Sequence, residues 1–133
     1  MKKLSILMTI LFSVMFSSPS WSEWTKIEGN WYVDFDRIRN IDGYVYYWDL
    51  TEFPKPIKKY DKLQKLHLIL SWTRYIQADC KLFRMRTLVA NEHKTLKATD
   101  RPFQTDQYND KFEYLIPNSS GEMILKRVCN HIK

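Results

Sequence analysis

The sequence lacks the short motifs that identify many families of enzymes and metal-binding proteins. It has no glycine-rich phosphate loop and no Gly-x-Ser-x-Gly nucleophile elbow. Its histidines, His67, His93 and His131, are far apart and lack the paired spacing of a metal site, so we interpret them as ordinary surface or sheet-edge residues. Asp34 and Asp36 fall in a predicted turn, where capping explains them better than acid–base catalysis does. We therefore predict a protein that is not an enzyme and that uses no cofactor or metal.

Cysteine is also scarce, because Cys80 and Cys129 are the only two in the chain. They lie 49 residues apart rather than in a Cys-x-x-Cys motif, which argues against a catalytic redox pair. Both follow a predicted export signal, and an oxidising compartment makes a structural disulfide the expected state. Closing a loop of roughly 50 residues stabilises a fold by about 4 kcal/mol in the chain-entropy model.

Long apolar runs are confined to the N-terminus. Residues 1–22 combine a basic start, an apolar stretch from Leu4 to Phe16 and the small-x-small sequence Ser20-Trp21-Ser22. This pattern predicts a secretory signal peptide that is cleaved near Ser22. The alternative is a transmembrane anchor, but a span needs about 20 apolar residues and this run is shorter. Position 23 is Glu rather than Cys, so we expect no N-terminal lipid.

Cleavage would leave residues 23–133, which we predict to form a single domain with its own core. Removing the first 22 of 133 residues leaves 111 and, with the loss of Lys2 and Lys3, lowers the formal net charge from +6 to +4. This mild excess allows an acidic partner without requiring one. No second apolar span follows, so we expect no transmembrane anchor after cleavage and a location in the periplasm, in the medium or at the cell surface.

Alternating and β-branched segments predict strands over residues 24–27, 31–33, 44–50, 66–80, 81–89 and 112–116. Pro54 and Pro56 are expected to end the third of these strands. The apolar face changes parity between Cys80 and Phe83, which predicts a bulge or bend near Lys81. Residues 91–110 are polar and predict a long loop with at most one weak strand.

A helix is predicted at the C-terminus. Ser119-x-x-Glu122 is a capping box, and an apolar stripe follows at helical spacing: Leu125, Val128, Cys129 and Ile132. Because Cys129 lies in that stripe, the helix is expected to pack on the sheet and bond to Cys80 there. The predicted fold is α+β, an antiparallel sheet of five or six strands with the C-terminal helix on one face and one disulfide.

The best candidate for a binding site is the segment from residue 55 to residue 65, which we expect to be mainly a loop. It holds five lysines: Lys55, Lys58, Lys59, Lys62 and Lys65. Clustered lysines bind sulfated glycans, phosphates or acidic proteins. The alternative is a solvated loop whose lysines keep an edge strand from aggregating. The predicted export argues against nucleic acid as the partner.

A second candidate is the aromatic strand, where Tyr44, Tyr46 and Trp48 share one face. Exposed aromatics would mark a ligand or homodimer face. In a small sheet with one covered face such residues more often form the core, and we favour that interpretation.

Several of these segments together resemble one family, the bacterial surface-adhesin protein E-like domain. The similar segments are Tyr32-Val33-Asp34, Trp48-Asp49-Leu50, Ser71, Asp79-Cys80 and Pro117-x-Ser119-x-x-Glu122 leading to Val128-Cys129. The resemblance covers roughly residues 24–130, most of the predicted mature chain. It implies a sheet backed by a disulfide-bonded C-terminal helix, and an adhesin for matrix or host proteins. No binding segment of the family matches the lysine-rich segment.

Two functions remain open from the sequence. The first is an exported, non-catalytic binding module that resembles surface adhesins and binds host matrix or envelope components. The alternative is a periplasmic inhibitor or accessory protein of a cell-envelope enzyme. Host lysozyme is a poor target for such an inhibitor, because both partners would be basic.

Overall fold

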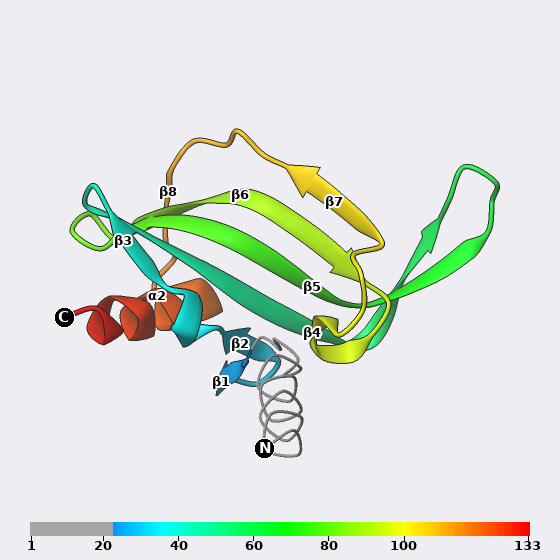
Figure 1. Ribbon diagram of the computed structural model, residues 1–133, viewed down its shortest axis with the longest axis horizontal. Coiled ribbons are helices and arrows are strands. Elements are labelled where there is room, and N and C mark those ends of the chain that lie inside the picture. Colours follow the sequence, from blue (N-terminus) through cyan, green and yellow to red (C-terminus); the bar gives the residue numbers. More distant parts are fainter. Residues whose placement is uncertain (1–22) are drawn as a thin grey trace, which may run out of the picture.

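The computed structural model describes residues 23–133, so the predicted signal peptide and its cleavage site lie outside the described residues. One antiparallel sheet organises the described chain (Figure 1). Its strands are β1 (Thr25–Glu28), β2 (Trp31–Val33), β3 (Arg39–Ile41), β4 (Tyr44–Tyr60), β5 (Leu66–Asp79), β6 (Arg84–His93), β7 (Gln104–Gln107) and β8 (Glu113–Tyr114). The helical elements are η1 (Phe35–Arg37), η2 (Leu96–Ala98) and α2 (Ser120–His131). Among residues 23–133, no helix is both long and apolar enough to cross a bilayer.

The sheet has eight strands, which corrects the prediction of five or six. Its main path runs β1-β2-β4-β5-β6-β7, with β3 paired to β4 and β8 paired to β6. The antiparallel α+β architecture itself is as predicted. The strands that the count missed are short edge segments such as β3, with three residues, and β7, with four. Such segments become strands because they pair with a longer neighbour, and their own sequence carries little β signal.

The central pair of the sheet is β4 and β5. Val45 pairs with Ala78 and Tyr47 pairs with Ile76, so apolar side chains of both strands lie on one face. β4 does not end at Pro54 and Pro56, as expected, but continues for 17 residues to Tyr60. The prolines fit because they lie within a register irregularity between Glu52 and Ile57, where the ladder does not need their missing N–H groups.

The chain reverses between β5 and β6, so the bulge or bend predicted near Lys81 is a tight turn between two strands. The Asp79 carboxylate accepts the backbone N–H groups of Lys81 and Leu82 at 2.9 and 3.2 Å, and Phe83 has a left-handed φ of 54°. Across this turn Ala78 pairs with Met85, so an even-numbered and an odd-numbered residue share one face of the sheet. The apolar face changes from even to odd positions because the chain reverses there. The register shift lies further along, between Tyr75 and Ile76.

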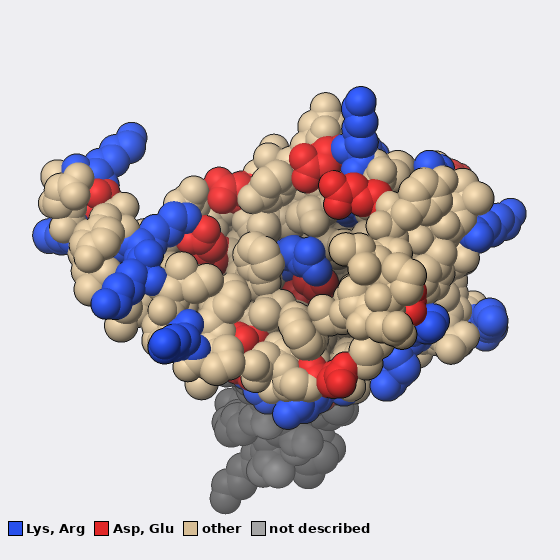
Figure 2. All heavy atoms as spheres, turned by 180° about the vertical axis from the view of Figure 1, so that it is seen from behind, with Lys and Arg blue, Asp and Glu red and all other residues tan. Residues whose placement is uncertain are grey.

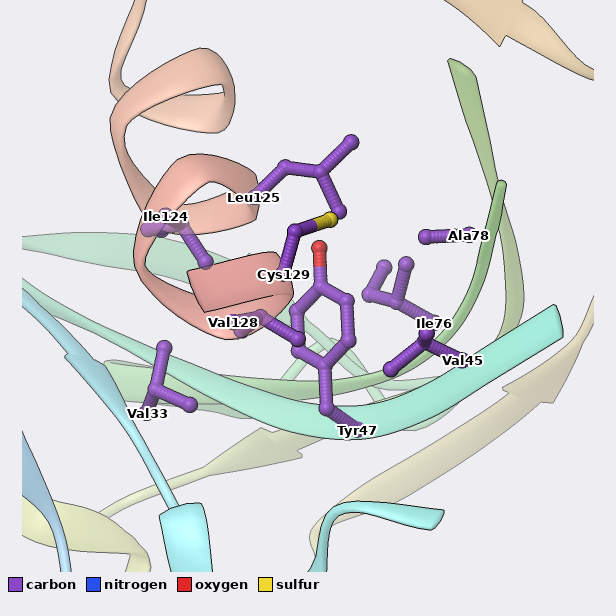
Figure 3. Packing of buried hydrophobic residues seen from close by; sticks show 9 residues of the cluster. All are labelled: Val33, Val45, Tyr47, Ile76, Ala78, Ile124, Leu125, Val128 and Cys129. Atoms are coloured by element: carbon purple, nitrogen blue, oxygen red, sulfur yellow. The ribbon is translucent and has the colours of Figure 1, made fainter. Parts of the chain in front are cut away.

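The main hydrophobic core lies between α2 and the sheet (Figure 3). The sheet contributes Val33, Val45, Tyr47, Ile76 and Ala78, and the helix contributes Ile124, Leu125, Val128 and Cys129. The Tyr47 ring points up from β4 toward the helix, as Figure 3 shows, and its burial raises the pKa of the Tyr47 hydroxyl. The predicted stripe was correct for three of these helix residues and omitted Ile124.

The ends of α2 are fixed in two ways. The Ser119 hydroxyl accepts the Glu122 N–H at 3.2 Å, as the capping box predicts, but the Glu122 carboxylate accepts the N–H of Asn118 rather than that of Ser119. Near the other end, Cys129 forms the predicted disulfide with Cys80. The helix is therefore held to the turn that joins β5 and β6 by a covalent bond as well as to the sheet by packing.

The opposite face of the sheet is covered only in part, by the segment around η2. There Ser71 donates its hydroxyl to the Thr95 carbonyl at 2.6 Å, and the buried His93 contacts the Asp100 carboxylate at 3.1 Å. The half-buried Tyr44, Tyr46 and Trp48 alternate along β4 with the core residues Val45 and Tyr47. These three aromatics therefore lie outside the main core, and our preferred prediction for them was wrong.

We predict that Cys129→Ser lowers the free energy of unfolding by a few kcal/mol, because it removes the cross-link from the unfolded chain. Urea denaturation followed by fluorescence measures this change. Wild-type protein in excess reductant is the matched control and should be destabilised similarly. A variant as stable as the oxidised wild type would show that helix packing alone fixes α2.

Candidate functional site

The outer half of the β4–β5 hairpin extends beyond the rest of the sheet (Figure 1, right). We call residues 53–69 the arm. Beyond the irregularity at the prolines, Ile57 pairs with Ile69 and Tyr60 with Leu66, and a turn over residues 61–65 joins the strands. The predicted lysine-rich loop is therefore mostly a two-stranded hairpin. A hairpin offers a more rigid and more extended binding surface than a loop does.

All five predicted lysines lie on the arm. Lys55, Lys58, Lys62 and Lys65 are exposed, and Figure 2 shows basic side chains spread over the projection at the left of the view. Lys59 differs, because its ammonium group pairs with the Glu92 carboxylate of β6 at 2.6 Å. Among residues 23–133, the other four lysines form no ion pair. Four charges of the arm are thus available to a partner.

One face of the arm is tied to the body of the domain. Lys59 and His67 pair across the two strands and so point to the same face. The His67 ring lies 4.5 Å from the ring of Phe103, and Ile69, two residues further along the same strand, is 2 % exposed. Together with the pair between Lys59 and Glu92, these contacts fix the direction in which the arm projects.

The tip of the arm is an ordered turn built around Asp61. Its carboxylate accepts the backbone N–H groups of Leu63 and Lys65 at 2.8 and 3.0 Å and contacts the His67 ring at 2.8 Å. Gln64 adopts a left-handed φ of 62° and donates its N–H to the Asp61 carbonyl. The hydrogen bond from His67, together with those from the two backbone amides, holds the pKa of the Asp61 carboxyl below its usual range.

The arm also exposes large apolar side chains, and the sequence analysis missed them as a binding feature. Leu63, at the tip, is 78 % exposed and Tyr60 is 61 % exposed, and three further residues are between 44 and 48 % exposed: Ile57, Leu66 and Leu68. The signal was visible in the alternation of lysine with apolar residues between positions 57 and 68. The sequence led us to interpret only the lysines as a binding feature, because the two prolines at the start of the segment favoured a loop.

A buried ion pair lies in the part of the β4–β5 hairpin that precedes the arm. The Arg74 guanidinium donates two hydrogen bonds to the Asp49 carboxylate, at 3.1 and 2.6 Å, and Asp49 is 2 % exposed. The nearby Asp49 charge raises the pKa of Arg74. Arg74 also lies 5.6 Å from the ring centroid of Trp72, which in turn packs against Phe53, the first residue of the arm. A chain of side-chain contacts therefore links the ion pair to the first residue of the arm through Trp72.

A shallow hollow of about 330 Å³ adjoins the base of the arm. Apolar residues form much of its lining: Phe53, Pro54, Pro56, Leu70 and Leu96. Since both the arm and η2 contribute to it, a partner bound along the arm could place an apolar group there.

The other candidate residues are not brought together. His67 lies on the arm, His93 is buried beside Asp100, and the ring of His131 packs against Phe35 on α2's side of the molecule. Asp34 caps η1 by accepting the Asp36 N–H at 3.1 Å, as predicted. Within residues 23–133, no group of three or more histidine, cysteine or acidic side chains could hold a metal ion.

The half-buried aromatics on the helix-free face pack mainly against one another. Trp48 stacks on Tyr75 at a centroid distance of 5.0 Å, and Tyr44 stacks on Phe112 at 5.6 Å. Arg84 and Arg86 each lie within 5 Å of the Phe112 ring centroid. Because these ring faces are already occupied, this layer shields the uncovered sheet, and the arm remains the stronger candidate site.

The fold defines a class of small α+β domains, in which an antiparallel sheet carries one disulfide-bonded helix. The family described as surface-adhesin protein E matches residues 21–130 of the sequence, and the chain belongs to this family. No curated protein matches the chain significantly.

Solved structures of Haemophilus influenzae protein E have the same fold. A second crystal form of that protein has a TM-score of 0.68 at 13 % identity, covering 86 % of this chain and 94 % of that one. Another structure of H. influenzae protein E gives 0.64 at 12 % identity, with 84 % and 87 % coverage. Protein E from non-typeable H. influenzae gives 0.61 at 13 % identity, with 85 % and 79 % coverage.

We predict that the amide resonances of Leu63 and Lys65 shift on acidification, with a midpoint below the usual aspartate pKa of about 3.9. Because the folded-state pKa of Asp61 is lowered, its stabilisation of the turn is complete above the unfolded-state pKa and is lost as the pH falls through the folded-state pKa. An NMR titration from neutral to acidic pH follows both amides. A midpoint at or above the usual value would contradict the hydrogen-bonded turn, and Asp61→Asn should abolish the transition.

Proposed function

We propose that this protein is an exported, non-catalytic binding module of the adhesin type, whose arm contacts an acidic partner. The partner classes that fit are an acidic protein and an acidic glycan, at the cell surface or in the periplasm. The observation that supports this proposal most directly is the arm itself, a fixed projection with four lysines that form no ion pair within residues 23–133.

The charge of the arm supports electrostatic recognition. The net excess of the predicted mature chain is mild, but residues 53–69 contain five lysines and a single acid, Asp61. That carboxylate is engaged by the turn and by His67. Point charges concentrated on a projection attract an acidic surface and speed encounter, and salt weakens such attraction because it screens exposed charges.

The family supports the adhesin character of the proposal, since its description is that of a surface adhesin. Low identity to the solved structures means that the shared fold does not transfer a particular partner. Support for an acidic partner therefore comes from the arm of this chain alone.

The same arm supports an alternative function, inhibition of a cell-envelope hydrolase. A rigid hairpin that projects from a domain has a shape that can enter an enzyme cleft, and Leu63 stands at its tip. Reduced activity of a muramidase or amidase from the envelope in the presence of this protein would favour inhibition over adhesion.

We predict that Lys58→Glu/Lys62→Glu abolishes salt-sensitive binding to heparin and to an acidic partner recovered from matrix or envelope extracts. Each substitution replaces attraction with repulsion on an exposed residue, so folding should be unaffected. Affinity at low and high salt gives the measurement. Lys111→Glu/Lys133→Glu, which changes two exposed lysines elsewhere by the same charge, is the control and should bind as the wild type does.

The proposal fails if the wild type retains no partner at low salt. It also fails if the arm variant and the control bind equally well, because the basic residues of the arm would then have no special role.

A further inference from the structure

The arm combines two surface features that an acidic glycan alone does not match. Five of the eleven exposed large apolar side chains of the described chain lie within residues 57–68 of the arm. The tip residue Leu63 is 78 % exposed, more than any of the others. Exposed apolar side chains concentrated in one short segment of a folded domain are a candidate contact site.

Three of these five residues, Tyr60, Leu66 and Leu68, share one face of the arm, whereas Ile57 lies on the other face and Leu63 lies in the turn. Tyr60 pairs with Leu66 and Lys58 pairs with Leu68, so these four side chains share the face opposite to that of Lys59 and His67. We call this the outer face. The inner face contacts Glu92 and Phe103, whereas the apolar side chains of the outer face are 44 to 61 % exposed.

The polar groups of the tip leave the outer face basic. Asp61 is the only acid in the arm, and its carboxylate is directed at the amides of its own turn and at His67. Lys58, Lys62 and Lys65 are exposed on the same segment as Leu63, and their ammonium groups form no ion pair within residues 23–133. A lysine can lay its aliphatic stem along an apolar surface and keep its ammonium group among anionic groups.

We propose that the tip of the arm docks on an anionic phospholipid bilayer, with Leu63 and the outer face entering the headgroup–acyl boundary and the lysines contacting phosphates. This inference rests on the proposed function, because it takes the arm as the binding element, and it adds an anionic lipid surface to the acidic protein and acidic glycan considered there. Apolar burial and attraction of basic residues to anionic lipids act together at such a surface.

Two features of the arm favour a bilayer over a soluble acidic glycan. A glycan would neutralise the lysines but leave Leu63, Leu66 and Leu68 in water, whereas a bilayer surface satisfies both groups. The projection also lets the tip reach a flat surface before the body of the domain does (Figure 1). Because Asp61 already orders the turn, docking costs little additional conformational entropy.

The test measures binding of residues 23–133 to vesicles by co-sedimentation. Vesicles of phosphatidylglycerol and phosphatidylethanolamine are compared with neutral phosphatidylcholine vesicles, with wild type, Leu63→Ser and Leu82→Ser. Leu82 is 51 % exposed in the turn between β5 and β6, so Leu82→Ser is the matched control. We expect the wild type and the control to bind anionic vesicles only, and Leu63→Ser to bind roughly tenfold or more weakly, because it loses a buried leucine side chain.

A second variant, Leu63→Trp, reports insertion through the difference between its emission and that of the wild type, because residues 23–133 already contain four tryptophans. Its fluorescence should shift to shorter wavelength with anionic vesicles and stay unchanged with heparin. Retained vesicle binding by Leu63→Ser, or no shift for Leu63→Trp, would overturn the insertion of the tip.

The two proposals fail in different ways. Binding to heparin or an acidic protein through Lys58 and Lys62, without binding to vesicles, overturns the lipid inference and leaves the proposed function intact. Absence of all three kinds of binding overturns both.

Discussion

The pairing of β4 with β5 is the interaction on which the rest of the structure depends. Its inner half provides the floor of the main core, where Tyr47 and Ile76 pair beneath α2. Its outer half leaves the body as the arm. One hairpin therefore serves stability at one end and exposure at the other. The buried pair of Asp49 and Arg74 links the two strands within the inner half.

The disulfide stabilises the core of this small domain without using residues of the arm. A single helix covers one face of the sheet, and the bond between Cys80 and Cys129 keeps that helix in place by restricting the unfolded chain. The core is thus secured at a distance from the arm, in residues that have no contact role there. Exposed residues such as Leu63 can then serve binding without a large effect on the fold, since surface substitutions rarely change stability by much.

Sequence reasoning succeeded where a local pattern has one physical solution. The structure confirms the capping residue Ser119, three residues of the predicted stripe (Leu125, Val128 and Cys129) and the pairing of the two cysteines. It failed where neighbours decide the outcome. β3 exists because it pairs with β4, and Pro54 is tolerated because a register irregularity spares its missing N–H.

The candidate site was predicted in part. The lysines were identified from their clustering, but the hairpin and its exposed apolar face were not, because the direction of a side chain depends on which strand its neighbour pairs with. Tyr60 lies opposite Leu66 only once residues 61–65 form the turn. The composition of the aromatic strand suggested that its residues form the core. The position of α2 decides which of them do, because the helix covers the face of Tyr47 and leaves Tyr46 half-buried on the other face.

The central claim, that the arm is the binding element, is tested most directly by mapping contacts on the protein in solution. Backbone amide resonances of residues 23–133 would be recorded while an anionic ligand is added, first heparin oligosaccharide and then phosphatidylglycerol bicelles. We expect the largest changes in chemical shift within residues 57–68 and no change in α2. Perturbations centred on the stacked aromatics around Trp48 and Tyr75, with an unchanged arm, would contradict it.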